Sequence, residues 1–165
     1  MNAQLKPDIR IEQETFTEAL AAEMFPLGQA CWDESTEVKK STCAFYGERN
    51  FAVDPDIERY KALAKSGVMI VVTLRDGATL NGYVIGLTYR SLHQKKIVCG
   101  SIDSIYIDPQ YRAYAAIVCE KIEQAMNVEI IGWATHIDGP VYQVLKARGY
   151  VGDDVIMEKR FVRRN

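Results

Sequence analysis

The chain has 165 residues, of which 48% are hydrophobic and 25% are charged, and its formal net charge is −2. This length suits one well-buried core rather than two full domains, so we expect a single domain over residues 1–165. The near-neutral charge excludes the basic excess of a typical nucleic-acid-binding protein and the acidic bias of a disordered chain.

The four cysteines lack the Cys-x-x-Cys spacing of a zinc site and do not indicate a small disulfide scaffold. The first residues lack the apolar core of a signal peptide, and no apolar run reaches the length of a membrane span. We therefore expect a cytoplasmic protein with no metal site and neither a membrane nor a nucleic acid as its partner.

The first third of the chain is predicted to be mainly helical. Apolar residues recur at three- and four-residue spacing, which predicts an amphipathic helix that begins near Thr15 and breaks around Pro26–Gly28. Residues 29–53 show no clean period and are interpreted as an irregular segment. A second helix is predicted from Asp54-Pro55 to Ser66-Gly67, since Asp caps and Pro fits a first helical turn.

The pattern then changes to that of strands. A β-branched run over residues 68–74, a turn at residues 75–77 and an apolar run over residues 80–89 predict an antiparallel pair. A third strand is predicted from Lys96 to Asp108, and Pro109 ends it.

The second half of the chain predicts a strand-helix-strand unit. A helix over residues 115–126 is followed by a short strand over residues 128–134, so that strand should lie parallel to the third one. A last helix opens at Asp138-Gly139-Pro140 and ends at Gly149, and residues 155–162 alternate as a closing strand. The predicted fold class is α/β (α+β): a mixed, mostly antiparallel sheet with one parallel, splayed pair and about four flanking helices.

The junction between the third strand and the following helix is the main candidate ligand site. Backbone N–H groups and the helix dipole favour an anion there. The junction carries the sequence Gln110-Tyr111-Arg112-Ala113-Tyr114-Ala115. The alternative interpretation is that Asp108-Pro109 simply ends a strand before an ordinary helix.

This hexapeptide resembles the Gln/Arg-x-x-Gly-x-Gly/Ala signature of the GNAT superfamily of N-acetyltransferases, which Gln110 and Ala115 fit. The order of the predicted elements and the sequence Lys146-Ala147-Arg148-Gly149-Tyr150 near the end are also similar to that superfamily. More loosely, residues 54–83, 91–93 and 103–112 look like the small stand-alone acetyltransferase-like proteins of tailed phages.

The resemblance implies that acetyl-coenzyme A lies between the central strand and the next parallel strand. Backbone groups of Ile105, Tyr106 and Ile107 are then expected to bind the acetyl and pantetheine arm. The amides from Tyr111 to Ala115 are expected to hold the pyrophosphate, with added charge from Arg112.

Three positions depart from the superfamily pattern. Ala113 stands where the family has glycine, a residue that permits close approach of the backbone to phosphate and unusual dihedral angles. Leu145 replaces a tyrosine that often protonates the departing thiolate; Tyr142, one turn earlier, is the substitute candidate or else a packing residue. Asp138 stands where the family often has an asparagine that contacts the pantetheine arm.

Amine acetylation also needs a proton acceptor. Asp103 lies in an apolar strand, where we expect it to share a face with Ile105 and Ile107 and to be made a better proton acceptor by burial. The alternative is a strand-edge carboxylate paired with a lysine or arginine. His93 and His136 lie in loops where the family site opens, although loop histidines are usually only solvated.

Two further groups of residues have a functional and a structural interpretation. Glu34 and Glu37, in the segment expected to line the acceptor site, either contact a substrate amine or are surface charges. A cysteine hydrolase that uses Cys99 or Cys119 is not favoured, because both residues fall in apolar elements and are expected in the core.

The leading hypothesis is acetyl transfer from acetyl-coenzyme A to a primary amine of a small molecule or a protein, by direct attack in a ternary complex. The alternative is a catalytically inactive binding or inhibitory module of the same fold, motivated by Ala113 and Leu145. A homodimer is also possible.

Overall fold

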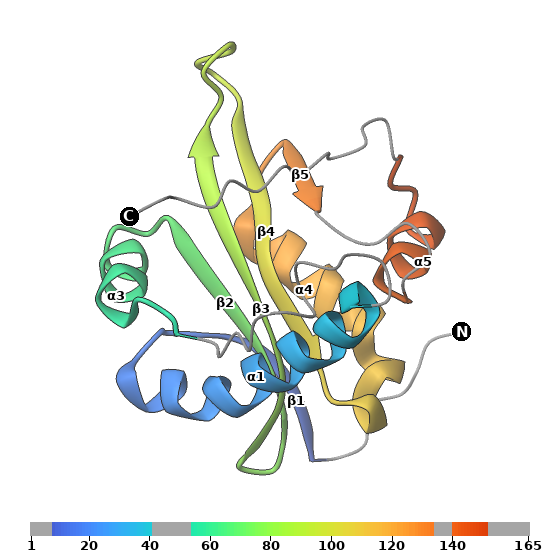
Figure 1. Ribbon diagram of the computed structural model, residues 1–165. Coiled ribbons are helices and arrows are strands. Elements are labelled where there is room, and N and C mark those ends of the chain that lie inside the picture. The colour runs from blue at the N-terminus through green and yellow to red at the C-terminus, as the bar shows by residue number, and fades with distance from the viewer. Residues whose placement is uncertain (1–7, 41–53, 134–139, 152–165) are drawn as a thin grey trace. The chain divides into compact units, whose positions relative to one another are not determined.

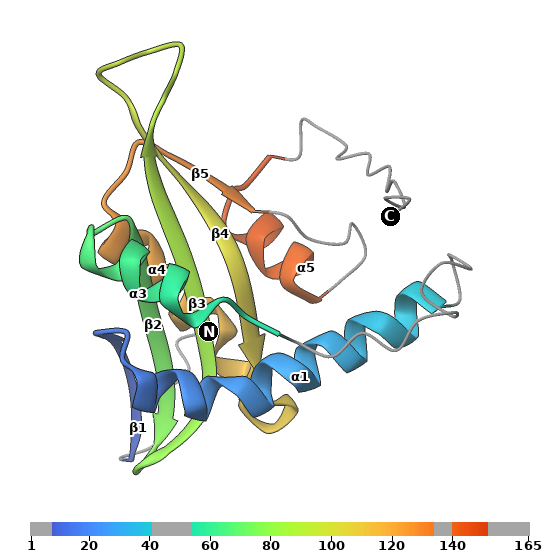
Figure 2. The ribbon, with the colours of Figure 1, turned by 60° about the vertical axis from the view of Figure 1, so that its left-hand side comes forward.

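The structure is a computed structural model, and it describes residues 8–40, 54–133 and 140–151. The chain divides into two compact units, Met1–Trp133 and Ala134–Asn165. The first unit contains a five-stranded sheet in the order β1-β2-β3-β4-β5. Helices α1 and α3 cover one face of this sheet and α4 covers the other, as Figure 1 and Figure 2 show.

Three of the four neighbouring strand pairs are antiparallel, and β4 and β5 form the one parallel pair. The predicted mixed, mostly antiparallel sheet is therefore confirmed. The strands are β1 (Ile9–Glu14), β2 (Met69–Asp76), β3 (Thr79–Arg90), β4 (Val98–Ile107) and β5 (Ile130–Trp133).

The helices of the described residues also follow the predicted order. In the first unit they are α1 (Glu18–Lys40), α3 (Ile57–Lys65), the 3-10 helix η1 (Pro109–Tyr114) and α4 (Ala115–Met126). The second unit contains α5 (Pro140–Ala147). Helix α3 begins slightly later than predicted, because Asp56 is its cap and accepts a hydrogen bond from the Arg59 amide. It ends as predicted, with Gly67 in the left-handed region at φ 73°.

Strand β1 was not predicted, and the assignment of the whole N-terminal third to helix is wrong there. Ile9 and Ile11 are buried, whereas Arg10 and Glu12 are exposed, so the segment has the two-residue period of a strand. It pairs antiparallel with the edge of β2 from Ile9 to Glu14. The run is too short and too polar for the pattern to stand out before the partner strand is known.

The predicted break of the first helix at Pro26 is also wrong, as is the irregular segment expected directly after it. Helix α1 continues through Pro26 to Lys40. Apolar side chains before and after the proline pack on the same cluster, so their burial outweighs the hydrogen bond that proline removes. Gly28 fits here because an added Cβ would lie 3.3 Å from the Tyr83 hydroxyl oxygen.

The sheet separates two hydrophobic clusters. On the α4 face, the buried residues include Val72, Leu74, Val84, Val118 and Ile122. On the face covered by α1 and α3, they include Leu20, Met24, Val71, Tyr83 and Tyr106. Two tyrosines of the second cluster lie on β3 and β4, so this face combines apolar packing with buried hydroxyl groups.

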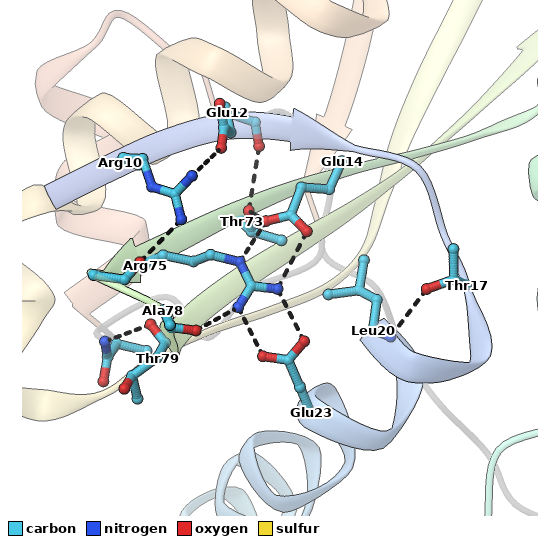
Figure 3. Close-up of polar contacts among 12 residues, drawn as sticks. Arg10, Glu12, Glu14, Thr17, Leu20, Glu23, Thr73, Arg75, Ala78 and Thr79 are labelled. Atoms are coloured by element: carbon cyan, nitrogen blue, oxygen red, sulfur yellow. Dashed lines mark hydrogen bonds and ion pairs between the residues drawn. The ribbon is translucent and has the colours of Figure 1, made fainter.

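A buried arginine ties β1, β2 and α1 together (Figure 3). Arg75 donates to both carboxylate oxygens of Glu14, at 2.6 and 3.2 Å, and to both of Glu23, at 2.7 and 3.0 Å. Its Nη1 also donates to the Ala78 carbonyl at 3.0 Å, and the Thr73 hydroxyl donates to Glu14. Every charge of this network therefore has a partner.

Some predictions lie outside the described residues. These are the closing strand over residues 155–162 and the segment of residues 41–53. Within the described residues, no helix combines the length and the apolar character needed to span a membrane.

Candidate functional site

The parallel pair of strands leaves one edge of β4 open. Strand β5 pairs with β4 from Cys99 to Ile102 and ends at Trp133, whereas β4 continues to Ile107. Among the described residues, the last part of β4 therefore has a strand partner only on the β3 side. This segment, residues 103–107, is called the open edge below.

A β-bulge begins the open edge. Ile85 pairs with Ser104 whereas Gly86 pairs with Ile102, so Asp103 is an extra residue on β4. The expectation that Asp103 shares a face with Ile105 is wrong for this reason. Asp103 is also exposed, not buried as expected: it lies on the side of α3, where its Oδ2 lies 3.4 Å from the Tyr60 hydroxyl, whereas Ile105 packs in the α4 cluster.

The register between β3 and β4 decides which backbone groups face the open edge. The Asp108 amide donates to the Asn81 carbonyl at 2.9 Å, which fixes the alternation of the β3–β4 ladder. By that alternation Tyr106 directs its backbone groups toward β3, whereas Ile105 and Ile107 direct theirs away from it.

Two side chains of the protein already contact the carbonyl groups of the open edge. The Cys31 thiol lies 3.6 Å from the Ile105 carbonyl oxygen, and the Arg112 Nε donates to the Ile107 carbonyl oxygen at 3.3 Å. Both carbonyl groups are thus within reach of donors. A ligand that paired with this edge would replace or adjoin these contacts.

Three tyrosines surround the same end of the α1 and α3 face. Burial, followed by the nearby Asp103 carboxylate, raises the pKa of Tyr60. Burial raises the pKa of Tyr83 to about 12. Burial and then a hydrogen bond to Glu34 raise the pKa of Tyr106 to about 12. All three hydroxyl groups therefore remain proton donors at neutral pH.

Glu34 joins Tyr106 to the predicted phosphate-binding arginine. Its Oε1 accepts from the Tyr106 hydroxyl at 3.1 Å, and its Oε2 accepts from the Arg112 Nη2 at 2.6 Å. Glu34 lies on helix α1, not in the irregular segment that the sequence suggested. The helix therefore places a carboxylate beside the open edge.

The predicted phosphate loop forms the 3-10 helix η1. Asp108 accepts from the Gln110 amide with its side chain at 2.9 Å and from the Tyr111 amide with its carbonyl at 2.8 Å. The Ala115 amide donates to the Arg112 carbonyl. These three amides are therefore already hydrogen-bonded within the chain.

The side chains of η1 have separate roles. The Tyr111 hydroxyl donates to Asp76 at 2.9 Å, and Tyr114 is buried in the α4 cluster. Ala113 is exposed, and Asn127 is the only non-glycine residue of the described chain with a positive φ. The backbone at Ala113 therefore does not require glycine, although the family pattern has it.

The remaining candidate residues lie in other parts of the chain. His93 is exposed in the loop between β3 and β4, beyond Val98. Since a strand rises about 3.3 Å per residue, Val98 is already roughly 16 Å along β4 from Asp103. Tyr142 lies on α5 in the second unit, with the Lys146 ammonium 5.7 Å from its ring centre. Asp138 and His136 lie outside the described residues, as does the side chain of Glu37.

Both core cysteines are confirmed, because Cys99 and Cys119 are buried. Within the described residues, no group of three or more His, Cys, Asp and Glu side chains is arranged to hold a metal ion. Sequence reasoning missed Cys31, Tyr60 and Tyr83. They come from three separate elements, and each one alone looks like an ordinary residue of an apolar face.

No protein-family model matches the chain, and the search of curated proteins gives no match either. Solved structures do match. An aminoglycoside acetyltransferase from an uncultured soil metagenomic sample has a TM-score of 0.72 at 11% identity, covering 98% of this chain and 100% of that one. A mutant of the BH1408 protein from Bacillus halodurans has a TM-score of 0.72 at 13% identity, covering 93% and 99%.

A ribosomal-protein-alanine N-acetyltransferase from Brucella melitensis biovar Abortus 2308 has a TM-score of 0.55 at 16% identity, covering 93% of this chain and 99% of that one. These identities are too low to carry an activity across, so the likeness concerns the fold. The mixed sheet with its single parallel pair and its flanking helices agree with that likeness. The chain has the fold of the GNAT superfamily of N-acetyltransferases.

Proposed function

We propose that the chain is an acyltransferase that moves an acetyl group from acetyl-coenzyme A to a primary amine by direct attack in a ternary complex. The observation that carries this proposal is the open edge of β4, where Ile105 and Ile107 direct their backbone groups away from β3. An extended arm with amide groups can hydrogen-bond to such an edge as an added strand does.

The residues present fit the pantetheine arm better than they fit the whole predicted phosphate cradle. The carbonyl groups of Ile105 and Ile107 face the open edge, and each oxygen has a second lone pair for the arm beside the contact it makes with Cys31 or Arg112. The amides of Tyr111 and Ala115 are already used within the chain. The pyrophosphate would therefore depend more on the Arg112 guanidinium than the sequence suggested.

In the proposed reaction, the amine nitrogen forms a bond to the acetyl carbonyl carbon and the bond from that carbon to sulfur breaks. The nitrogen loses a proton and the sulfur gains one. Asp103 is the proposed proton acceptor, because it is an exposed carboxylate beside the open edge and contacts Tyr60. Tyr142 remains the proposed acid for the thiolate, and no role is proposed for His93.

The inactive-module alternative has no observation in its favour. One of the two observations that suggested this alternative was the alanine at position 113 in place of glycine, and the backbone there adopts no conformation that needs glycine. The other observation, the leucine at position 145, removes only one candidate for the acid that protonates the thiolate.

The test is a calorimetric titration with acetyl-coenzyme A, followed by mass spectrometry of acetyl transfer to a panel of primary amines. Asp103→Asn should lower kcat by about 100-fold, within the range for a general base, and leave binding of acetyl-coenzyme A unchanged. Asp33→Asn, an exposed carboxylate on α1, is the matched control and should retain full activity. Absence of binding at millimolar ligand would refute the acetyltransferase function, whereas an unchanged kcat in Asp103→Asn would refute only the role of that residue.

A further inference from the structure

Glu34 is held at the open edge by two residues of different kinds. Tyr106 belongs to β4 and is buried, and its hydroxyl donates to Glu34 Oε1 at 3.1 Å. Arg112 belongs to η1 and donates to Glu34 Oε2 at 2.6 Å. The carboxylate therefore links the face of the sheet under α1 to the segment expected to contact phosphate.

The two bonds differ in how easily they can be exchanged. The Tyr106 hydroxyl comes from a buried residue of the sheet, and its pKa is raised to about 12, so it stays protonated and in place at neutral pH. The Arg112 and Glu34 side chains are 43% and 50% exposed. Exposed ion pairs of this kind are weak, because water solvates both partners nearly as well.

Arg112 has a stronger partner within the proposed function. Its Nε donates to the Ile107 carbonyl, which places the guanidinium beside the edge proposed for the pantetheine arm. A pyrophosphate bound at η1 offers more negative charge than one carboxylate, and several oxygens that match the guanidinium fork. Bound coenzyme A would therefore compete with Glu34 for Arg112.

We propose that Arg112 exchanges Glu34 for the pyrophosphate of coenzyme A, and that Glu34, still held by Tyr106, then binds a positively charged amino group of the acceptor. This inference rests on the proposed acetyltransferase function and adds the chemical class of its acceptor, a cationic amine. Before coenzyme A binds, the charge of Arg112 neutralises Glu34. Acceptor and coenzyme A should therefore strengthen each other's binding, since such coupling is reciprocal.

Asp103 supports this assignment of the acceptor side. It lies on the same face of β4 as Tyr106, where it contacts Tyr60 of α3. Once Arg112 has moved, the carboxylates of Glu34 and Asp103 are both available on this face, one to hold a cation and one to accept a proton.

The first measurement is a calorimetric titration of coenzyme A into the full chain and into Glu34→Gln. Because the variant removes the competitor for Arg112, it should bind coenzyme A about two- to fivefold more tightly, the range that corresponds to a weak exposed ion pair. Glu58→Gln is the matched control: Glu58 is an exposed carboxylate, paired with Lys61 at 2.9 Å on α3. Its affinity for coenzyme A should be unchanged.

The second measurement repeats both titrations in the presence of millimolar spermidine, and then of the peptide Ala-Lys-Ala with a free N-terminus. At least one of these cations should tighten coenzyme A binding to the unmodified chain, and neither should do so in Glu34→Gln. The two probes distinguish a small polyamine from a protein amine as the source of the cation.

Each outcome has a defined meaning. An affinity of Glu34→Gln for coenzyme A that is equal to or weaker than that of the unmodified chain overturns the exchange of Arg112. If neither amine changes the affinity of the unmodified chain, the acceptor role of Glu34 is overturned while the acetyltransferase function stands. If the Glu34→Gln variant binds coenzyme A and the unmodified chain does not, the exchange is supported. If neither protein binds coenzyme A, the function is overturned together with the inference.

Discussion

Helix α1 supplies a carboxylate to each of two arginines, and the two ion pairs differ in burial and in role. Glu23 and Glu34 are about three helical turns apart on the same helix. Glu23 contacts Arg75, whose side chain is only 10% exposed, in a network that also contains Glu14. Glu34 contacts Arg112, whose side chain is 43% exposed, at the end of the open edge.

The difference lies in solvation and in the number of partners. Arg75 has two carboxylates and a carbonyl oxygen around its guanidinium. Removing Arg75 therefore leaves the partly buried carboxylates of Glu14 and Glu23 without their cation. Arg112 can leave Glu34 because water and other anions are available to both residues. Burial thus makes the first pair part of the fold, and exposure leaves the second free to take part in binding.

The largest effect should come from breaking the Arg75 network. Arg75→Met is expected to lower the free energy of unfolding by about 3 kcal/mol, because Glu14 then remains partly buried without its cation. Urea denaturation measures this change. Arg10→Met removes an exposed arginine from the neighbouring strand and should cost far less. Equal losses in the two variants would contradict the structural role given to Arg75.

A smaller effect should appear on acidification. The hydrogen bonds from Arg75 lower the pKa of Glu14 and of Glu23 below the ordinary value of 4.5. Because the folded pKa values lie below the unfolded ones, the stabilisation is complete above about pH 4.5 and is lost as the pH falls through the lowered values.

Unfolding free energies measured between pH 6 and pH 3 should therefore decline more steeply for the unmodified chain than for Arg75→Met. Arg75 itself stays protonated throughout, because the hydrogen bonds that it donates to Glu23 and Glu14 raise its pKa. Parallel curves for the two proteins would show that other groups cause the acid sensitivity.

The smallest change in stability is expected at the open edge. Glu34→Gln and Arg112→Met should each alter the free energy of unfolding by less than about 0.5 kcal/mol, as for other exposed pairs. The double variant should show a coupling energy of the same small size in a double-mutant cycle. A loss as large as that of Arg75→Met would mean that Arg112 is fixed in place and cannot exchange partners.

The sequence by itself determined the central part of the fold. The β-branched runs, the turn at residues 75–77 and the strand-helix-strand unit after Lys96 specify β2, β3, β4, α4 and β5 in the right order and directions. These elements are long or strongly periodic, and tight turns or a helical crossover join them. Their local patterns therefore leave few alternatives.

The tertiary structure decided the edges of the fold and the composition of the candidate site. Strand β1 exists because β2 offers it a partner, and α1 passes Pro26 because one apolar stripe packs on both sides of it. The bulge that moves Asp103 to the tyrosine side depends on the register between β3 and β4, which no local pattern encodes.

The partner of Arg112 was likewise beyond the reach of the sequence. Its position in the hexapeptide suggested phosphate, but the structure brings it to Glu34, 78 residues away along the chain. Local periodicity determines which elements form, because each residue interacts first with its near neighbours. Which charges meet at the open edge depends on how α1, β4 and η1 pack, and only the folded chain fixes that.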